Sequence, residues 1–135
     1  MAWGEVARSF DLKGHALKSA VLFDLDETLF NRSASVRSFV EQQFSNKDWG
    51  SFAGLEALCD RFMELDSRGS VPTVYRVVTE EIGLPGNDNG LALFNDYATN
   101  AWRYAFAFEG MHDLLLWLRE DSHKTGIVSN GQAHI

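Results

Sequence analysis

Residues 20–30 read AVLFDLDETLF, and this stretch decides the fold class. Apolar residues fill positions 20–23 without alternation, which is typical of a strand covered on both faces in a parallel sheet. The run ends at Asp24, and Asp26 and Thr28 follow at intervals of two residues. Because ligands bind beyond the carboxyl ends of the strands in such sheets, the pattern predicts a strand over residues 20–25 with a functional site at its end.

The bulk properties of the chain exclude several classes of protein. Its 135 residues suffice for one compact domain or for a small domain with an insertion. The net charge of −7 argues against general nucleic-acid binding, which needs a basic surface. No apolar stretch is long enough to span a membrane, and no secretion signal is apparent. Cys59 is the single cysteine, so an internal disulfide is excluded and a reducing, cytoplasmic setting is expected.

The region after residue 30 is predicted to be helical. Ser33 or Ser35 can cap a first helix, whose apolar residues recur at the spacing of one helical face. Similar apolar patterns around residues 55–65 and 74–82 predict two further helices. A loop rich in Gly, Pro and Asn is expected over residues 83–90, and a fourth helix over residues 91–105.

The last part of the chain returns to an alternation of helix and strand. Apolar residues at i, i+3, i+4 and i+7, beginning at Met111, form one face of a predicted helix. A short strand over residues 126–128 follows and ends in the sequence Ser129-Asn130-Gly131. Strand, helical insert, helix and strand is the outline of an α/β parallel crossover with a block of helices inserted into it.

Two aspartates separated by one residue suit phosphoryl transfer. One ionised carboxylate can attack phosphorus, and the other can protonate the leaving oxygen and later deprotonate water. A divalent cation would relieve the repulsion between carboxylates and phosphate, and hard oxygen ligands favour Mg²⁺. Thr28, Ser129 and Asn130 offer hydrogen bonds to the loop or to phosphoryl oxygens. Each motif alone is more often an ordinary turn or helix cap, so it is their joint position after two strands that is informative.

These motifs resemble those of the haloacid dehalogenase-like hydrolases. Residues 23–29, FDLDETL, look like the first motif of that superfamily, and residues 127–131, IVSNG, look like the second. The roughly 80 residues between the motifs resemble the helical (C1) cap that these enzymes insert after the first motif. The resemblance implies an incomplete Rossmann-like parallel sheet core formed by residues 1–30 and 107–135, with residues 31–106 as the α-helical cap.

The resemblance also implies a role for each residue of the motifs. Asp24 would be the nucleophile and a metal ligand, and Asp26 the general acid/base and a second metal ligand. Thr28 would support the loop, and Ser129 and Asn130 would bind the phosphoryl group. True haloacid dehalogenases lack the second aspartate and need no metal, so Asp26 points to a Mg²⁺-dependent phosphatase acting on a small phosphorylated metabolite. Glu27 replaces the commoner glycine, a departure that relatives tolerate.

Two elements of the family pattern are not found. The third-motif lysine or arginine and the fourth-motif acidic residues normally come after the second motif, and this chain stops at Ile135. Lys124 precedes the second strand and cannot replace the lysine by chain order. We therefore expect a C-terminally truncated chain that is weakly active or inactive by itself. An open sheet edge in such a chain would tend to pair with another copy, which predicts a possible homodimer.

Two other function classes remain open from the sequence. One is a C–halogen hydrolase of the 2-haloacid dehalogenase type, against which Asp26 argues. The other is a non-catalytic protein that keeps the fold for binding or assembly. Arg32 is expected to be a solvated surface residue rather than a ligand for an anionic substrate. The aromatic residues at 49, 97, 102, 104, 106 and 108 are expected to pack in the core rather than to line a substrate pocket.

Overall fold

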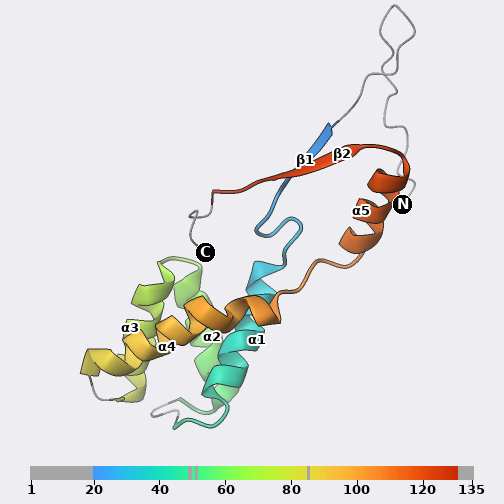
Figure 1. The fold of residues 1–135 in the computed structure, drawn as a ribbon. Coiled ribbons are helices and arrows are strands. Elements are labelled where there is room, and N and C mark those ends of the chain that lie inside the picture. Colours follow the sequence, from blue (N-terminus) through green and yellow to red (C-terminus); the bar gives the residue numbers. More distant parts are fainter. Residues whose placement is uncertain (1–19, 49, 51, 85, 131–135) are drawn as a thin grey trace, which may run out of the picture.

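The computed structural model describes residues 20–48, 50, 52–84 and 86–130, and residues 1–19 lie outside this range. The chain forms a mixed α/β structure whose elements follow one another in two groups (Figure 1). In chain order the elements are β1 (Ala20–Asp24), α1 (Arg32–Phe44), α2 (Leu55–Asp66), α3 (Val71–Ile82), α4 (Gly86–Asn100), the 3₁₀ helix η1 (Ala101–Tyr104), α5 (Met111–Glu120) and β2 (Lys124–Val128). The predicted order of strand, helical insert, helix and strand is confirmed.

The two strands pair in parallel to form a short sheet. The register runs from Ala20 opposite Lys124 to Asp24 opposite Val128, so the carboxyl ends of both strands lie at the same edge. In the described part of the chain β1 and β2 pair only with each other, which leaves one edge of each strand unpaired. Pairing of two copies along such an edge stays a prediction. β2 begins at Lys124, two residues before its predicted start.

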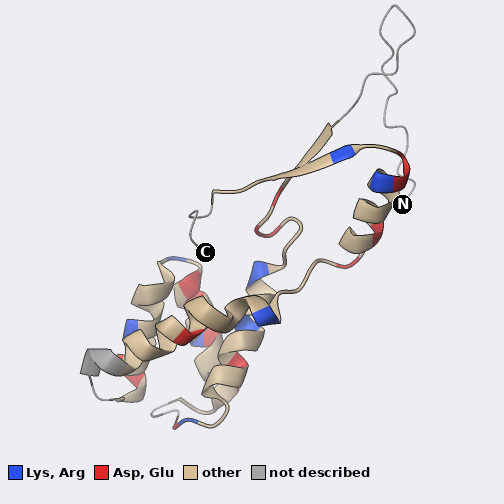
Figure 2. Ribbon diagram, viewed as in Figure 1, with Lys and Arg blue, Asp and Glu red and all other residues tan. Residues whose placement is uncertain are grey.

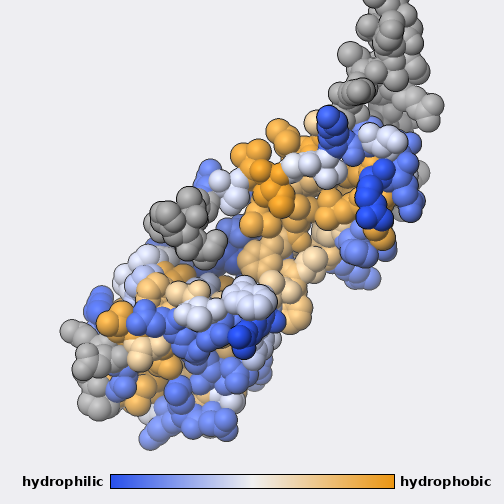
Figure 3. Space-filling view, in the orientation of Figure 1, coloured by the Kyte–Doolittle hydropathy of each residue, from blue (hydrophilic) through white to orange (hydrophobic). Residues whose placement is uncertain are grey.

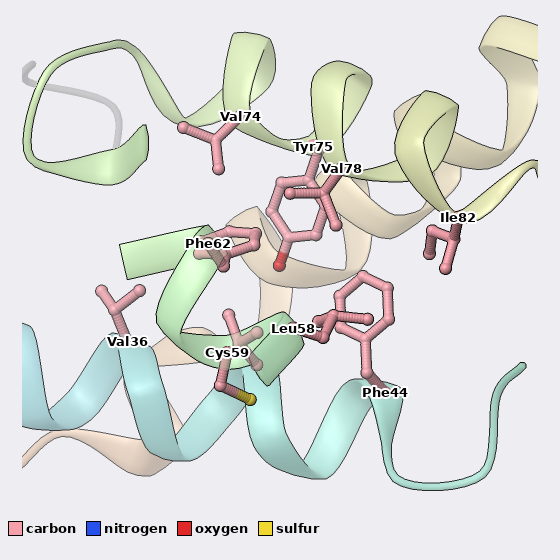
Figure 4. Close-up of a cluster of buried hydrophobic side chains, with 10 residues drawn as sticks. Val36, Phe44, Leu58, Cys59, Phe62, Val74, Tyr75, Val78 and Ile82 are labelled. Atoms are coloured by element: carbon pink, nitrogen blue, oxygen red, sulfur yellow. The ribbon is translucent and has the colours of Figure 1, made fainter. Parts of the chain in front are cut away.

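Helices α1 to α4 and η1 form a compact group of helices, which we call the helical segment (Figure 1). Its core contains fully buried side chains from α1, α2 and α3 (Figure 4). Tyr75 of α3 lies at the centre, with its ring 5.0 Å from that of Phe62 in α2 and 6.5 Å from that of Phe44 in α1. The apolar periodicity that predicted these helices is thus explained by one shared core. Cys59 is buried in it.

Tyr75 brings a hydroxyl group into this apolar core, and the group is satisfied. It donates a hydrogen bond of 2.7 Å to Gln43 Oε1, and Gln43 Nε2 donates to the backbone oxygen of Leu93 and to Asp96 Oδ2. Burial raises the pKa of Tyr75. Among the described residues, no buried side-chain nitrogen or oxygen lacks a hydrogen-bond partner. This series of hydrogen bonds therefore connects α1 to both α3 and α4 without leaving an unpaired polar group.

Two connections join the helical segment to the strands, and they run side by side (Figure 1). Phe30 in the first connection forms an antiparallel bridge with Ala107 in the second. Asn31 N donates to Phe106 O at 2.8 Å, and Phe106 N donates to the buried Ser35 Oγ at 2.9 Å. This short ribbon fixes where α1 begins relative to the chain that leads into α5.

Two details of the predicted helix boundaries are wrong. Asn31 caps α1 instead of Ser33 or Ser35, because its Oδ1 accepts from Ala34 N at 3.0 Å. The predicted loop over residues 83–90 is shorter, since α4 begins at Gly86. A Cβ at the buried Gly90 would lie 3.0 Å from Thr79 Oγ1, so glycine allows α4 to pack closely on α3. Packing here outweighs the low helix propensity of glycine and asparagine.

The aromatic residues divide between core and surface. Tyr97 and Tyr104 pack edge-on against the buried Phe39, with ring centroids 5.6 and 5.4 Å away, as predicted. Trp102 and Phe106 are 70% and 47% exposed, so the prediction of core packing is wrong for them. Trp49 lies outside the described residues. Within the described ranges no helix is long and apolar enough to cross a membrane.

Candidate functional site

The loop that follows β1 brings the predicted site residues into a small space. The backbone oxygen of Leu25 accepts hydrogen bonds from the amides of Thr28, Leu29 and Phe30 at 3.3, 3.1 and 2.9 Å. The chain therefore turns back at once instead of continuing the strand. In a continued strand Asp24 and Asp26 would share one face and Leu25 would point to the other, whereas this turn replaces that extended spacing with a compact loop.

Thr28 and Asp24 are in direct contact within this loop. Thr28 Oγ1 donates a hydrogen bond to Asp24 Oδ2 at 3.2 Å, in an exposed position. Asp24 and Asp26 are also exposed. Figure 2 shows acidic residues in this part of the chain, beyond the end of β1. The hydroxyl of Thr28 thus orients the first carboxylate while leaving it open to solvent.

Ser129 and Asn130 follow β2 at the same edge of the sheet. Asp24 lies opposite Val128 in the parallel register, so Ser129 is one residue beyond the partner of Asp24. Neighbouring strands are about 4.8 Å apart, which places both motifs at one end of the sheet. The register therefore places Ser129 and Asn130 beyond the same end of the sheet as Asp24 and Thr28. Gly131 lies outside the described residues.

The same register places Lys124 away from this edge. Lys124 is opposite Ala20, at the amino end of the sheet. Four residues of strand separate it from the level of Asp24, which corresponds to about 13 Å. The prediction that Lys124 does not serve as the missing lysine agrees with this position. It does not precede the second strand, as predicted, but is the first residue of β2.

Glu27 occupies an unusual backbone conformation between Asp26 and Thr28. Its φ of 56° lies in the left-handed region, which costs a residue other than glycine about 1 kcal/mol. The Glu27 carboxylate accepts two hydrogen bonds from Ser33, one from the amide at 2.7 Å and one from the hydroxyl at 2.8 Å. Ser33 belongs to the first turn of α1, where amides have no partner within the helix. The conformation explains why glycine suits this position.

Arg32 is not the solvated surface residue that we expected. Its guanidinium donates two hydrogen bonds to the Asp66 carboxylate, of 2.5 and 2.9 Å, and the Asp66 side chain is only 3% exposed. This contact raises the pKa of Arg32, and Asp26 adds a smaller effect in the same direction. Asp66 lies 34 residues along the chain, so no local pattern reveals the pair. Arg32 thereby joins the start of α1 to the end of α2.

Tyr97 lies in the same charged environment. Burial raises the pKa of its hydroxyl, whereas the charge of Arg32 and a hydrogen bond with it act in the opposite direction. Asp66 and Asp26 also raise the pKa of Tyr97, Asp26 by the smaller amount. The sequence analysis expected Tyr97 to pack in the core and did not single out Asp66, whose partner Arg32 is distant along the chain.

The donor set at this edge fits a hard divalent cation in its chemistry. In the described residues no group of three or more His, Cys, Asp or Glu side chains comes together that could enclose a metal ion. Mg²⁺ does not require such an enclosure, because it keeps several waters and is held by one or two carboxylates together with substrate phosphate. Asp24 and Asp26 each offer an exposed carboxylate, which is a group of this kind.

A surface hollow of about 370 Å³ lies elsewhere in the molecule. Lys47, Asp48, Leu84 and Leu93 contribute to its lining. Lys47 follows the carboxyl end of α1, whereas the loop with Asp24 precedes the amino end of that helix. Thirteen helical residues span about 20 Å, so the hollow is remote from the candidate site.

Comparison with known proteins identifies the family. The chain matches the model of the haloacid dehalogenase-like hydrolases over residues 21–135, which include both motifs and all the described helices and strands after Ala20. A search among curated proteins found no significant match. Since the family match covers well over half of the sequence and agrees with the placement of the two motifs at one sheet edge, the chain belongs to the haloacid dehalogenase-like hydrolases.

Proposed function

We propose that this hydrolase cleaves phosphate monoesters of small metabolites in a Mg²⁺-dependent reaction, with Asp24 as nucleophile and Asp26 as general acid/base. The observation that carries the proposal is the compact loop after β1. It holds two exposed carboxylates beside a hydroxyl that contacts Asp24, at the sheet edge where Ser129 and Asn130 follow β2. Two carboxylates with hydrogen-bond donors suit attack on phosphorus.

In the first half of the reaction an Asp24 carboxylate oxygen attacks phosphorus. The bond between phosphorus and the ester oxygen breaks, and Asp26 in its protonated form gives its proton to the leaving alkoxide. The hydrogen bond from Thr28 to Asp24 Oδ2 leaves Asp24 Oδ1 as the oxygen available for attack. Ser129 and Asn130 would donate hydrogen bonds to the phosphoryl oxygens on which charge develops.

In the second half Asp26, now ionised, accepts a proton from a water molecule that attacks phosphorus. The bond between Asp24 and phosphorus breaks, inorganic phosphate leaves and both carboxyl groups return to their starting states. Asp26 therefore acts once as acid and once as base. This dual task requires it to reach both the leaving group and the attacking water.

Asp24 and Asp26 would hold the Mg²⁺ ion, which when bound supplies positive charge against the negative charge of the carboxylates and the phosphate. We further propose that residues 31–106 act as a cap over the site, since the loop after β1 leads directly into α1, the first helix of the helical segment, and Phe30 in that loop is bridged to Ala107 at the far end of the segment. A cap of this kind excludes water from the reaction. The cytoplasmic location is part of the proposal and rests on the single cysteine.

The proposal is tested by assaying the full-length protein on p-nitrophenyl phosphate with and without Mg²⁺. Asp24→Asn and Asp26→Asn should each lower turnover by roughly 10³-fold or more, because each removes a group that acts in the transition state. Asp113→Asn, an exposed carboxylate on α5, is the matched control and should leave turnover unchanged. Equal turnover in Asp24→Asn and the control would exclude Asp24 as nucleophile.

The same protein should be incubated with 2-chloropropionate and analysed for chloride. The presence of Asp26 argues against C–halogen hydrolysis, so no chloride is expected. Chloride release without a divalent cation, with no phosphatase activity, would replace the phosphatase proposal by the halogen alternative.

A further inference from the structure

Glu27 combines a strained backbone conformation with a side chain that accepts two hydrogen bonds from the start of α1. Its backbone is left-handed at φ 56°, a conformation in which glycine would be free of strain. Its carboxylate nevertheless reaches six residues along the chain to Ser33, where it accepts from both the amide and the hydroxyl. A glycine here would keep the backbone and lose the link.

The link adds a direct side-chain connection between the loop after β1 and the first turn of α1. On one side, the Glu27 amide donates to Phe30 O at 2.8 Å and so belongs to the loop that carries Asp26 and Thr28. On the other side, Ser33 is in the first turn of α1, next to the amide of Ala34 that Asn31 caps. Glu27 and Asn31 therefore satisfy consecutive amides, and the negative charge of Glu27 suits the amino end of the helix.

We infer that Glu27 is a positioning residue for the proposed phosphoryl transfer: its carboxylate anchors the loop to α1 and thereby fixes Asp26 relative to Asp24. The inference rests on the proposed function. Thr28, the next residue, contacts Asp24, and Asp26 is the residue before Glu27. A shift at Glu27 would therefore move the acid/base and the hydroxyl that orients the nucleophile together. Displacements of about 1 Å are enough to cost a large factor in rate.

Three variants separate positioning from simple helix capping. Glu27→Gln keeps an oxygen acceptor for Ser33, Glu27→Gly removes the link and the strain, and Glu27→Ala removes the link alone. Turnover should fall by roughly 10- to 100-fold in Glu27→Gly and Glu27→Ala with little change in KM, because ground-state binding is not affected. Glu27→Gln should stay within about threefold of the wild type, since it retains a weaker, neutral hydrogen bond.

The dependence on the leaving group gives a readout that capping would not change. If Glu27 positions the acid Asp26, Glu27→Gly should harm hydrolysis of an alkyl phosphate more than that of p-nitrophenyl phosphate, whose leaving group needs little protonation. Equal losses on both substrates, or a change in thermal stability with unchanged turnover, would overturn the inference. In either case Asp24→Asn and Asp26→Asn report separately on the proposed function.

A second measurement is independent of activity. The amides of Thr28, Leu29 and Phe30 all donate to Leu25 O, so their hydrogen exchange reports on the order of the loop. By NMR, these amides should exchange roughly tenfold faster in Glu27→Ala than in the wild type, whereas amides of α2 should be unchanged. Unchanged exchange at these three amides would show that the Glu27 link does not hold the loop, whatever the enzyme assay finds.

Discussion

The helical segment and the pair of strands differ sharply in how they are stabilised. Within the described residues, the fully or nearly fully buried apolar side chains lie in the helical segment, apart from Leu29 and Leu118. In the strands, Leu22, Ile127 and Val128 are each more than half exposed. Figure 3 shows apolar side chains gathered on the surface over the strands. The candidate site thus lies on the part of the molecule with the smaller core.

This difference shows that apolar side chains have two different uses in this molecule. In α1 to α3 apolar residues at helical spacing build a self-contained core around Tyr75. In β1 and β2 short apolar runs form an apolar surface, because continuous apolar strands belong to sheets covered on both faces. The candidate site lies at the edge of the sheet, and the ribbon around Phe30 and the Glu27 link connect that edge to the helical segment.

The largest expected effect on stability is a difference between two leucine-to-alanine substitutions, one in each region. Leu58→Ala removes a side chain with no exposed surface and should lower the free energy of unfolding by roughly 2–5 kcal/mol. Leu22→Ala removes one that is 66% exposed and should change it by less than about 0.5 kcal/mol. Chemical denaturation followed by circular dichroism measures both. Similar losses in the two variants would contradict the comparison.

A smaller difference in stability is expected between variants of two ion pairs that both join α1 to α2. Asp66→Asn leaves Arg32 without its buried partner and should cost about 2 kcal/mol, less than for a fully buried pair because Arg32 is 29% exposed. Asp60→Asn breaks the exposed pair with Arg37 and should cost at most about 1 kcal/mol. If thermal denaturation showed the Asp60 variant to be the less stable one, the assignment of Asp66 as a structural anchor would be wrong.

How much of this structure can be predicted from the sequence depends on how far apart along the chain the contacting residues are. The apolar run of β1 and the helical faces of α1 to α3 and α5 are local patterns, and the structure confirms them. The Arg32–Asp66 pair joins residues 34 apart, and no periodicity signals it. α4 starts earlier than predicted, and the close packing of Gly90 on α3 is a tertiary contact that helix propensity does not signal.

The candidate site follows the same rule. Asp24, Asp26 and Thr28 were identified because they are adjacent along the chain, and Ser129 and Asn130 because they end a second strand. The link from Glu27 to Ser33 was missed, although the replacement of the usual glycine by Glu27 was a usable signal. A charged side chain at a position that favours glycine invites a search for the partner that compensates for the strain.

The smallest effect concerns alkaline pH and is confined to the helical segment. Burial raises the pKa values of Cys59 and Tyr75 above their ordinary values of 9.0 and 10.0. Above these values the unfolded chain loses protons that the folded chain retains, so the free energy of unfolding should fall as pH rises. Between pH 8 and 10.5 the slope should be shallower in Cys59→Ala than in the wild type. An identical slope would show that Cys59 does not contribute.

Trapping the covalent intermediate on Asp24 tests the central claim most directly. The full-length protein, turning over p-nitrophenyl phosphate with Mg²⁺, is quenched with borohydride, which reduces an aspartyl phosphate to homoserine. The account predicts homoserine at position 24 by peptide mass spectrometry, absent without substrate and absent in Asp24→Asn. Hydrolysis at full rate with an unmodified Asp24, or with homoserine at another position, would contradict it.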